Sequence, residues 1–190
     1  MTASWMDINK PPSPATAVTA AQVANGPIFP PQQRLLTYSP DEWEGFVEEW
    51  AYYCLTTKYE HVLRFSGAGD MGIDVAGFVG DERLLGVWDN FQCKHYGNAI
   101  RPSDVWVEFG KIIWYSYKGE YTVPRRYYFV SPRGAGTSLS RLFSNDTKLR
   151  EELLANWDKH VKNAITSTQE VLLDAKLRAY VDSFDFTIFD

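Results

Sequence analysis

Three side chains on one predicted β-hairpin could act at a single point: the carboxylate of Asp74, the amide of Gln92 and the amine of Lys94. The two predicted strands lie within residues 67–80 and 87–94. An acid on one strand, facing an amide and an amine two residues apart on the next, is an unusual combination to direct at one place. A solvated polar face on the hairpin is the alternative interpretation.

The return strand predicts which of its side chains lie together. Side chains alternate in direction along a strand, so Gln92 and Lys94 share one face while Phe91 and Cys93 share the other. Residues 90–95 also form a short polar island in otherwise apolar, aromatic sequence. This island favours a functional site over a plain solvated face.

A helix starting at Ser39 is predicted to position a fourth candidate, Glu44. Ser39 is a typical N-cap, Pro40 suits the first helical position, and Glu42 completes a capping box. Apolar residues then recur at helical spacing: Trp43, Phe46, Val47, Trp50, Ala51 and Cys54. Glu44 lies at the border of this stripe, where the core can hold it while its carboxylate reaches a polar cavity. A solvated helix face is again the alternative.

The remaining elements predict an α/β domain with a small mixed β-sheet flanked by helices and a helical C-terminal part. The domain is expected to span 34–190, and 1–33 to form a Pro/Ala-rich N-terminal arm holding six of the ten prolines. The arm carries the apolar residues Trp5, Ile8, Ile28 and Phe29. Beyond the hairpin, we expect strands near 61–65 and 126–131, helices near 104–118, 137–143, 146–165 and 168–181, and strand-like alternation at 184–190.

The amino-acid composition excludes several classes of protein. The chain has 190 residues, 45% of them apolar, and a net charge of −5, which argues against a basic coat for non-specific nucleic-acid binding. The two cysteines, Cys54 and Cys93, form no metal or redox motif, and we expect both to face the core in a reducing compartment. No membrane-spanning or signal segment is evident, so a soluble, cytoplasmic protein is expected.

Two glycine-rich stretches resemble nucleotide-binding motifs without their context. Gly67, Gly69 and Gly72 match a dinucleotide-binding pattern, but a strand pattern follows where the mechanism needs a helix N-terminus. These glycines are better suited to a tight turn. Residues 133–137 lack the Gly-Lys-Ser/Thr ending of a phosphate loop. Neither stretch predicts a bound nucleotide.

Taken together and in order, Trp43-Glu44, Gly72-Ile-Asp74 and Gln92-Cys-Lys94 resemble the PD-(D/E)XK nuclease superfamily. The similarity is greatest to the Mrr-like restriction endonucleases, which use Gln-x-Lys in place of Asp/Glu-x-Lys. The stretch 67–75 is also similar to nuclease domains of bacterial anti-phage effectors of the CBASS and Lamassu types. The specific match covers about residues 39–96.

This resemblance implies Mg²⁺-dependent hydrolysis of DNA phosphodiester bonds, with Mn²⁺ as a possible substitute ion. Asp74 would be the central ligand, with Glu44, the side-chain oxygen of Gln92 and the carbonyl of Cys93 completing the protein's share. Lys94 would orient or deprotonate the attacking water and counter the developing charge. The four catalytic candidates are therefore Glu44, Asp74, Gln92 and Lys94.

The resemblance also implies partners. Double-stranded DNA needs cationic contacts to its phosphates, for which the candidates are Arg101, Lys111, Arg125, Arg126 and Arg133. Related effectors act with a sensor or activating partner, as a separate subunit or a fused domain, or as homo-oligomers. Two alternatives stay open: a degenerate nuclease fold serving as a DNA-binding or assembly module, and an RNase with the same chemistry.

Overall fold

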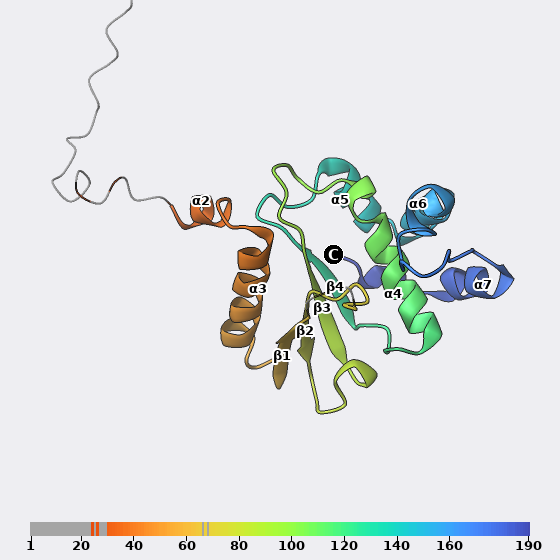
Figure 1. Cartoon of the computed structure of the whole chain (residues 1–190), viewed down its shortest axis with the longest axis horizontal. Coiled ribbons are helices and arrows are strands. Elements are labelled where there is room, and N and C mark those ends of the chain that lie inside the picture. Colours follow the sequence, from red (N-terminus) through yellow and green to blue (C-terminus); the bar gives the residue numbers. More distant parts are fainter. Residues whose placement is uncertain (1–23, 25, 27–29, 66, 68) are drawn as a thin grey trace, which may run out of the picture.

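A four-stranded mixed sheet forms the centre of the protein (Figure 1). The structure is a computed structural model that describes residues 24, 26, 30–65, 67 and 69–190. Strands β1 (His61–Arg64), β2 (Val75–Phe78), β3 (Trp88–Cys93) and β4 (Arg126–Val130) lie in the order β1-β2-β3-β4. The first three strands are antiparallel, and β4 is parallel to β3. The predicted α/β class with a small mixed sheet is confirmed.

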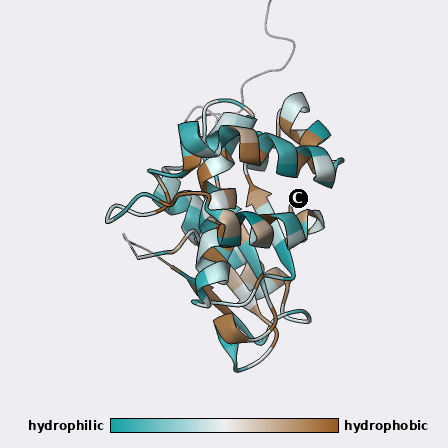
Figure 2. Cartoon of the chain, turned by 90° about the vertical axis from the view of Figure 1, so that its right-hand side faces the viewer, coloured by the Kyte–Doolittle hydropathy of each residue, from teal (hydrophilic) through white to brown (hydrophobic). Residues whose placement is uncertain are grey.

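Helices cover both faces of the sheet (Figure 1). Helix α3 (Pro40–Cys54) packs on one face and α4 (Trp106–Lys118) on the other, with a short helix, α2 (Pro31–Leu35), before α3. The helical C-terminal part consists of α5 (Thr137–Phe143), whose Phe143 stacks on Phe129 of β4, and of α6 (Asp146–Asn156) and α7 (Ala175–Ser183), which form a further layer beyond α4. Figure 2 shows hydrophilic (teal) and hydrophobic (brown) residues interspersed along the helices.

Helix α3 begins as its sequence predicts. The Ser39 side chain accepts a hydrogen bond from the Glu42 N–H (3.2 Å), and the Glu42 carboxylate accepts one from the Ser39 N–H (2.7 Å). Its buried residues Trp43, Val47 and Ala51 pack with Phe91 and Cys93 in one core cluster. Cys54 does not join them; the prediction that it faces the core is wrong, because only Ala51 is buried in the last five residues of α3.

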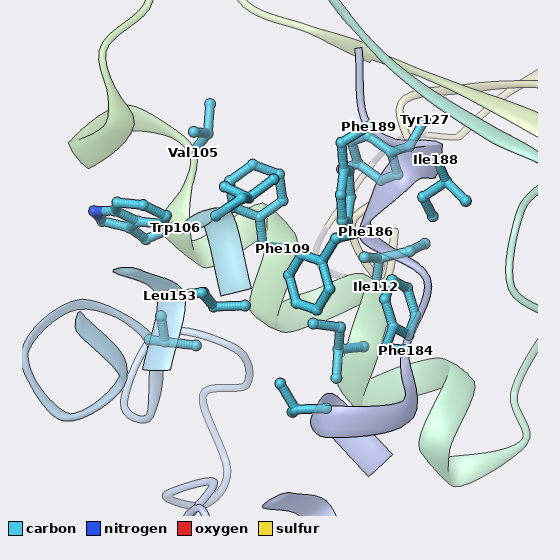
Figure 3. Close-up of a cluster of buried hydrophobic side chains, with 14 of the residues drawn as sticks. Val105, Trp106, Phe109, Ile112, Tyr127, Leu153, Phe184, Phe186, Ile188 and Phe189 are labelled. Atoms are coloured by element: carbon cyan, nitrogen blue, oxygen red, sulfur yellow. The ribbon is translucent and has the colours of Figure 1, made fainter. Parts of the chain in front are cut away.

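Helix α4 belongs to the second and larger core cluster, on the other face of the sheet. Figure 3 shows Phe109 and Ile112 of this helix beside the C-terminal aromatic residues. A short π-helical segment, Trp157–Val161, crosses α4 at Gly110. A Cβ atom at Gly110 would lie 2.2 Å from Val161 Cγ1, so a glycine is needed for this close approach.

Several predicted boundaries are wrong for local reasons. The predicted helix 146–165 is α6 followed by the π-helical segment. The predicted helix 168–181 is α7 alone, which starts later because the Asp174 carboxylate accepts hydrogen bonds from the N–H groups of Lys176 (3.0 Å) and Leu177 (2.8 Å). In the hairpin, a 3-10 turn at Arg83–Leu85 lengthens the connection, so β3 begins at Trp88.

The end of the chain extends the sheet only at its last two residues. The predicted strand 184–190 contains a 3-10 turn, Phe186–Ile188, started by hydrogen bonds to the Asp185 carboxylate. Asp190 then donates its N–H to the Tyr127 carbonyl (3.0 Å) and accepts from the Phe129 N–H (2.8 Å). These two bonds satisfy part of the outer edge of β4.

Two further expectations concern the arm and the membrane. The four apolar residues of the arm, Trp5, Ile8, Ile28 and Phe29, lie outside the described residues, and α2 crosses the predicted boundary at 33/34. Within the described part of the chain, no helix has the length and apolar character that crossing a bilayer requires.

Candidate active site at the end of the hairpin

The β2–β3 register brings Asp74 and Gln92 together, as the sequence predicts. Val75 pairs with Phe91, which places Asp74 next to Gln92 just beyond the last β2 pair. The Asp74 Oδ2 atom accepts hydrogen bonds from Gln92 Nε2 (2.7 Å) and from the Cys93 N–H (2.7 Å). Among the described residues, no hydrogen bond reaches Asp74 Oδ1, which leaves this oxygen for a ligand.

The predicted alternation along β3 is also confirmed. Phe91 and Cys93 pack in the cluster of α3, whereas Trp88, on the opposite face, packs in the cluster of α4. Gln92 and Lys94 follow Trp88 at even spacing and face α4. The site is therefore built between the sheet and α4.

Asp74 is poised to change its charge near neutral pH. Burial raises the pKa of its carboxyl group from 3.8 to about 6, although the positive charge of Lys94 and the Cys93 N–H lower it. The negative charges of Glu108 and Glu44 add to the rise. A carboxylate held in this way gains from any cation that comes to lie beside it.

Lys94 makes a buried ion pair that the sequence analysis did not predict. Its Nζ atom lies 2.6 Å from Glu108 Oε1, and both side chains are 11% exposed. Burial lowers the pKa of Lys94, but the charge and hydrogen bond of Glu108 act against burial, and the pKa is raised overall. Lys94 is therefore an ammonium group at neutral pH, suited to stabilising negative charge rather than to taking a proton.

Glu108, in the first turn of α4, is the main residue that the sequence analysis missed. Its Oε2 atom is buried and accepts no hydrogen bond from the described residues, and Lys111 Nζ lies 3.7 Å away. A signal was present, because Glu108 falls between Val105 and Ile112 on the apolar face of α4 (i−3 and i+4). An acid at such a position needs a partner or a ligand.

Glu44 approaches the same end of the sheet from α3. Its Oε2 atom lies 3.2 Å from Arg64 Nε and 3.1 Å from Arg64 Nη2, and Arg64 also contacts Asp41. Its carboxylate is therefore paired on the α3 side of the sheet, and its influence on Asp74 is through charge. The structure places Glu44 near the predicted site without bringing it into contact with the hairpin residues that form it.

The five cationic candidates fall into two groups. Arg101 and Arg133 are exposed on loops joined by the Ile100–Ala135 bridge, at the same end of the sheet as Lys94. Within the described part of the chain, no carboxylate lies within 4.0 Å of either guanidinium. Lys111, between Asp70 (3.8 Å) and Glu108, also lies at this end.

The other two arginines lie at the opposite end, where β4 begins. Arg125 holds the buried Asp89 through two hydrogen bonds (3.0 and 2.6 Å), and Arg126 donates to the Thr187 carbonyl (3.2 Å). Both guanidinium groups thus have structural partners. Arg101, Lys111 and Arg133 are the candidates that lie at the same end of the sheet as Asp74.

The glycine-rich stretch before β2 forms turns where the structure describes it, as expected. Gly72 has φ +82°, its N–H donates to Asp70 Oδ1 (2.9 Å), and a Cβ atom there would lie 2.8 Å from Lys111 Cβ. Gly72 therefore lets this turn lie directly against α4. Asp74 follows two residues later.

A second acidic group lies at the far end of the hairpin. Glu60, His61 and Asp81 place one ligand atom each within 4.8 Å of one another, a geometry that could hold a metal ion; among the described residues, no other such group of three was found. His61 Nε2 lies 3.2 Å from Asp81 Oδ1. Because His61 pairs with Phe78 and Arg64 with Val75, this group is separated from Asp74 by the length of the strands.

No protein-family model matches the chain, and no curated protein or solved structure matches it. The resemblance to PD-(D/E)XK nucleases thus rests on the residue pattern, and membership of that superfamily stays a prediction. The geometry of Asp74, Gln92, Lys94 and Glu108 stands independently of it.

Proposed function

We propose that this protein is a metal-dependent endonuclease that hydrolyses DNA phosphodiester bonds at the site formed by Asp74, Gln92, Lys94 and Glu108. The observation that carries the proposal is that the acid and the amide of the hairpin are in contact, while its amine lies on the same face of the sheet and pairs with Glu108 of α4. Gln92 lies on β3, Lys94 directly after it, Asp74 directly before β2, and Glu108 on α4.

The donor set fits a hard divalent cation. Asp74 Oδ1 and Glu108 Oε2 are carboxylate oxygens without a hydrogen bond from the described residues, and Mg²⁺ prefers oxygen ligands of this kind. Asp74 would hold the ion, with Glu108 as a second carboxylate and the Gln92 amide oxygen as a neutral ligand. A bound Mg²⁺ supplies a water of lowered pKa and a counter-charge for the phosphate.

The remaining chemistry falls to residues of the chain. Lys94, fixed as an ammonium group, can donate hydrogen bonds to a phosphate oxygen as negative charge builds up on it. Arg101, Arg133 and Lys111 can hold neighbouring phosphates of the substrate. The Cys93 N–H keeps the Asp74 carboxylate oriented (2.7 Å).

A second candidate function is a non-catalytic DNA-binding or assembly module. The observation in its favour is the closed Lys94–Glu108 pair, because an ammonium group bonded at 2.6 Å to a carboxylate must exchange that partner to meet a phosphate. The same observation predicts low activity for the isolated protein and activation by a partner or by DNA itself.

Cleavage of supercoiled plasmid with and without Mg²⁺ separates the two functions. Asp74→Asn and Lys94→Ala should each abolish nicking. The matched controls are Asp81→Asn, an exposed acid at the far end of the same hairpin, and the exposed Lys58→Ala; both should nick like the parent. Equal cleavage by the two site variants and the parent would refute the nuclease assignment.

The substrate is tested in the same assay. Plasmid DNA and a structured RNA of equal nucleotide concentration should be compared, since an RNase would use the same groups. DNA binding without nicking at high protein concentration would favour the non-catalytic module.

A further inference from the structure

Tyr127 places a buried hydroxyl group behind Gln92. It lies on β4 in register with Asn90, and its side chain is fully buried. The hydroxyl donates a hydrogen bond to Gln92 Oε1 (2.9 Å), and it lies 3.4 Å from the carbonyl oxygen of Gly72. Gln92 is thus held between Tyr127 on one side and Asp74 on the other.

In this arrangement the Gln92 amide directs its NH₂ group, and not its oxygen, toward Asp74. Its NH₂ group donates to Asp74 Oδ2 (2.7 Å), and an amide nitrogen has no lone pair to offer a cation. Only Oε1 can be a ligand, and Oε1 faces Tyr127. A cation held by Asp74 therefore requires the amide to turn over about its last side-chain torsion, which is a soft one.

Tyr127 can satisfy both amide orientations. A tyrosine hydroxyl is both a donor and an acceptor. With the amide as it stands, the hydroxyl donates to Gln92 Oε1; with the amide turned, it accepts from Gln92 Nε2 and donates its own hydrogen to the Gly72 carbonyl.

We infer that Tyr127 is a positioning residue that allows Gln92 to turn its amide oxygen toward a divalent cation held by Asp74. This inference rests on the proposed metal-dependent function and adds a residue to it. Without the hydroxyl, the turned amide would bury an NH₂ group that lacks this acceptor, which penalises the ion-bound arrangement.

Tyr127→Phe tests the inference, with Tyr59→Phe as the matched control. Tyr59 is also a buried tyrosine whose hydroxyl has a polar partner, Asp89 Oδ2 at 2.6 Å, but it lies on the α3 side of the sheet. Calorimetric titration with Mn²⁺ should be carried out on the Asp81→Asn background, which removes the surface group at Glu60 and His61. Tyr127→Phe should weaken Mn²⁺ binding about tenfold or more, as loss of a partner behind a metal ligand usually does. Tyr59→Phe should leave it unchanged.

A measurement on the parent keeps the inference falsifiable if Tyr127→Phe does not fold. The side-chain amide signals of Gln92, assigned in a ¹⁵N-correlated NMR spectrum by their loss in Gln92→Glu, should shift on addition of Mg²⁺. They should not shift in Asp74→Asn. Gln92 signals that stay in place while the parent binds Mg²⁺, or equal affinity in Tyr127→Phe, would overturn this inference alone. Absence of ion binding at Asp74 in the parent would overturn the proposed function with it.

Discussion

Asp74 should make the affinity for a divalent cation depend steeply on pH between pH 5 and pH 8. A carboxylate with an ordinary pKa is already ionised over this range. The perturbation is a change from pH 8 to pH 5. Burial raises the pKa of Asp74 to about 6, and a cation binds the ionised form. The apparent Kd for Mn²⁺ should therefore rise about twofold at pH 6 and about tenfold at pH 5, a change of about 1.4 kcal/mol at the lower pH.

The same shift has a consequence for stability, with a sign that can be checked. Because the pKa of Asp74 is higher in the folded chain than in the unfolded chain, the folded chain binds more protons between about pH 4 and pH 6. The contribution of this group to stability is therefore present at low pH and lost as the pH rises through that range, by up to about 3 kcal/mol. Asp74→Asn should remove this cost and raise the free energy of unfolding at pH 8 by about 1–3 kcal/mol.

Denaturant unfolding at pH 8 and calorimetric Mn²⁺ titration from pH 5 to pH 8 are the assays. Asp81→Asn is the control, because Asp81 is exposed and its loss should change stability by less than about 0.5 kcal/mol. A parent whose Mn²⁺ affinity is flat from pH 5 to pH 8, or an Asp74→Asn variant less stable than the parent at pH 8, would refute the reasoning.

Four further outcomes are expected. Lys94→Ala should abolish cleavage with little change in Mn²⁺ affinity. It should also lower the free energy of unfolding by about 1–3 kcal/mol, because Glu108 loses its partner. The double variant Lys94→Met, Glu108→Gln should recover this stability but not the cleavage. Gln92→Glu should raise Mn²⁺ affinity at pH 8 but lose the gain at pH 5, since the introduced carboxylate raises the pKa of Asp74. Equal gains in affinity at both pH values would contradict this expectation. Glu44→Gln should reduce cleavage only in part. Gly72→Ala should cost about 1–2 kcal/mol in thermal or denaturant unfolding, because φ +82° and the contact with Lys111 both disfavour a side chain.

Local patterns predicted those parts of the protein that local physics decides. Strand alternation predicted that the side chains of Gln92 and Phe91 lie on opposite faces of the sheet. The capping box at Ser39 predicted the residue at which α3 begins. Both depend on neighbours within four residues in the sequence. The hairpin then made the Asp74–Gln92 contact predictable, since two adjacent strands leave few registers.

Local sequence patterns do not predict contacts between elements that lie far apart in the sequence. Glu108 meets Lys94 only because α4 crosses the sheet at the end of β3, and helical periodicity alone gives no crossing point. Arg125 was a candidate for DNA binding, yet it neutralises the buried Asp89, a contact between residues 36 apart. The late start of α7 follows from one side chain, the capping carboxylate of Asp174.

The placement of charge in this fold argues for a site rather than for a structural role. Asp74, Lys94 and Glu108 lie where the sheet meets α4, yet the cores on the two faces of the sheet are apolar and packed without them. Removing charged groups from water costs more than most ion pairs return, so apolar residues here would give a more stable protein. The pKa of Asp74 records that cost directly, because burial is its largest cause. A fold that maintains this cost, with carboxylate oxygens left without hydrogen bonds from the described residues, is organised to gain from something that binds there.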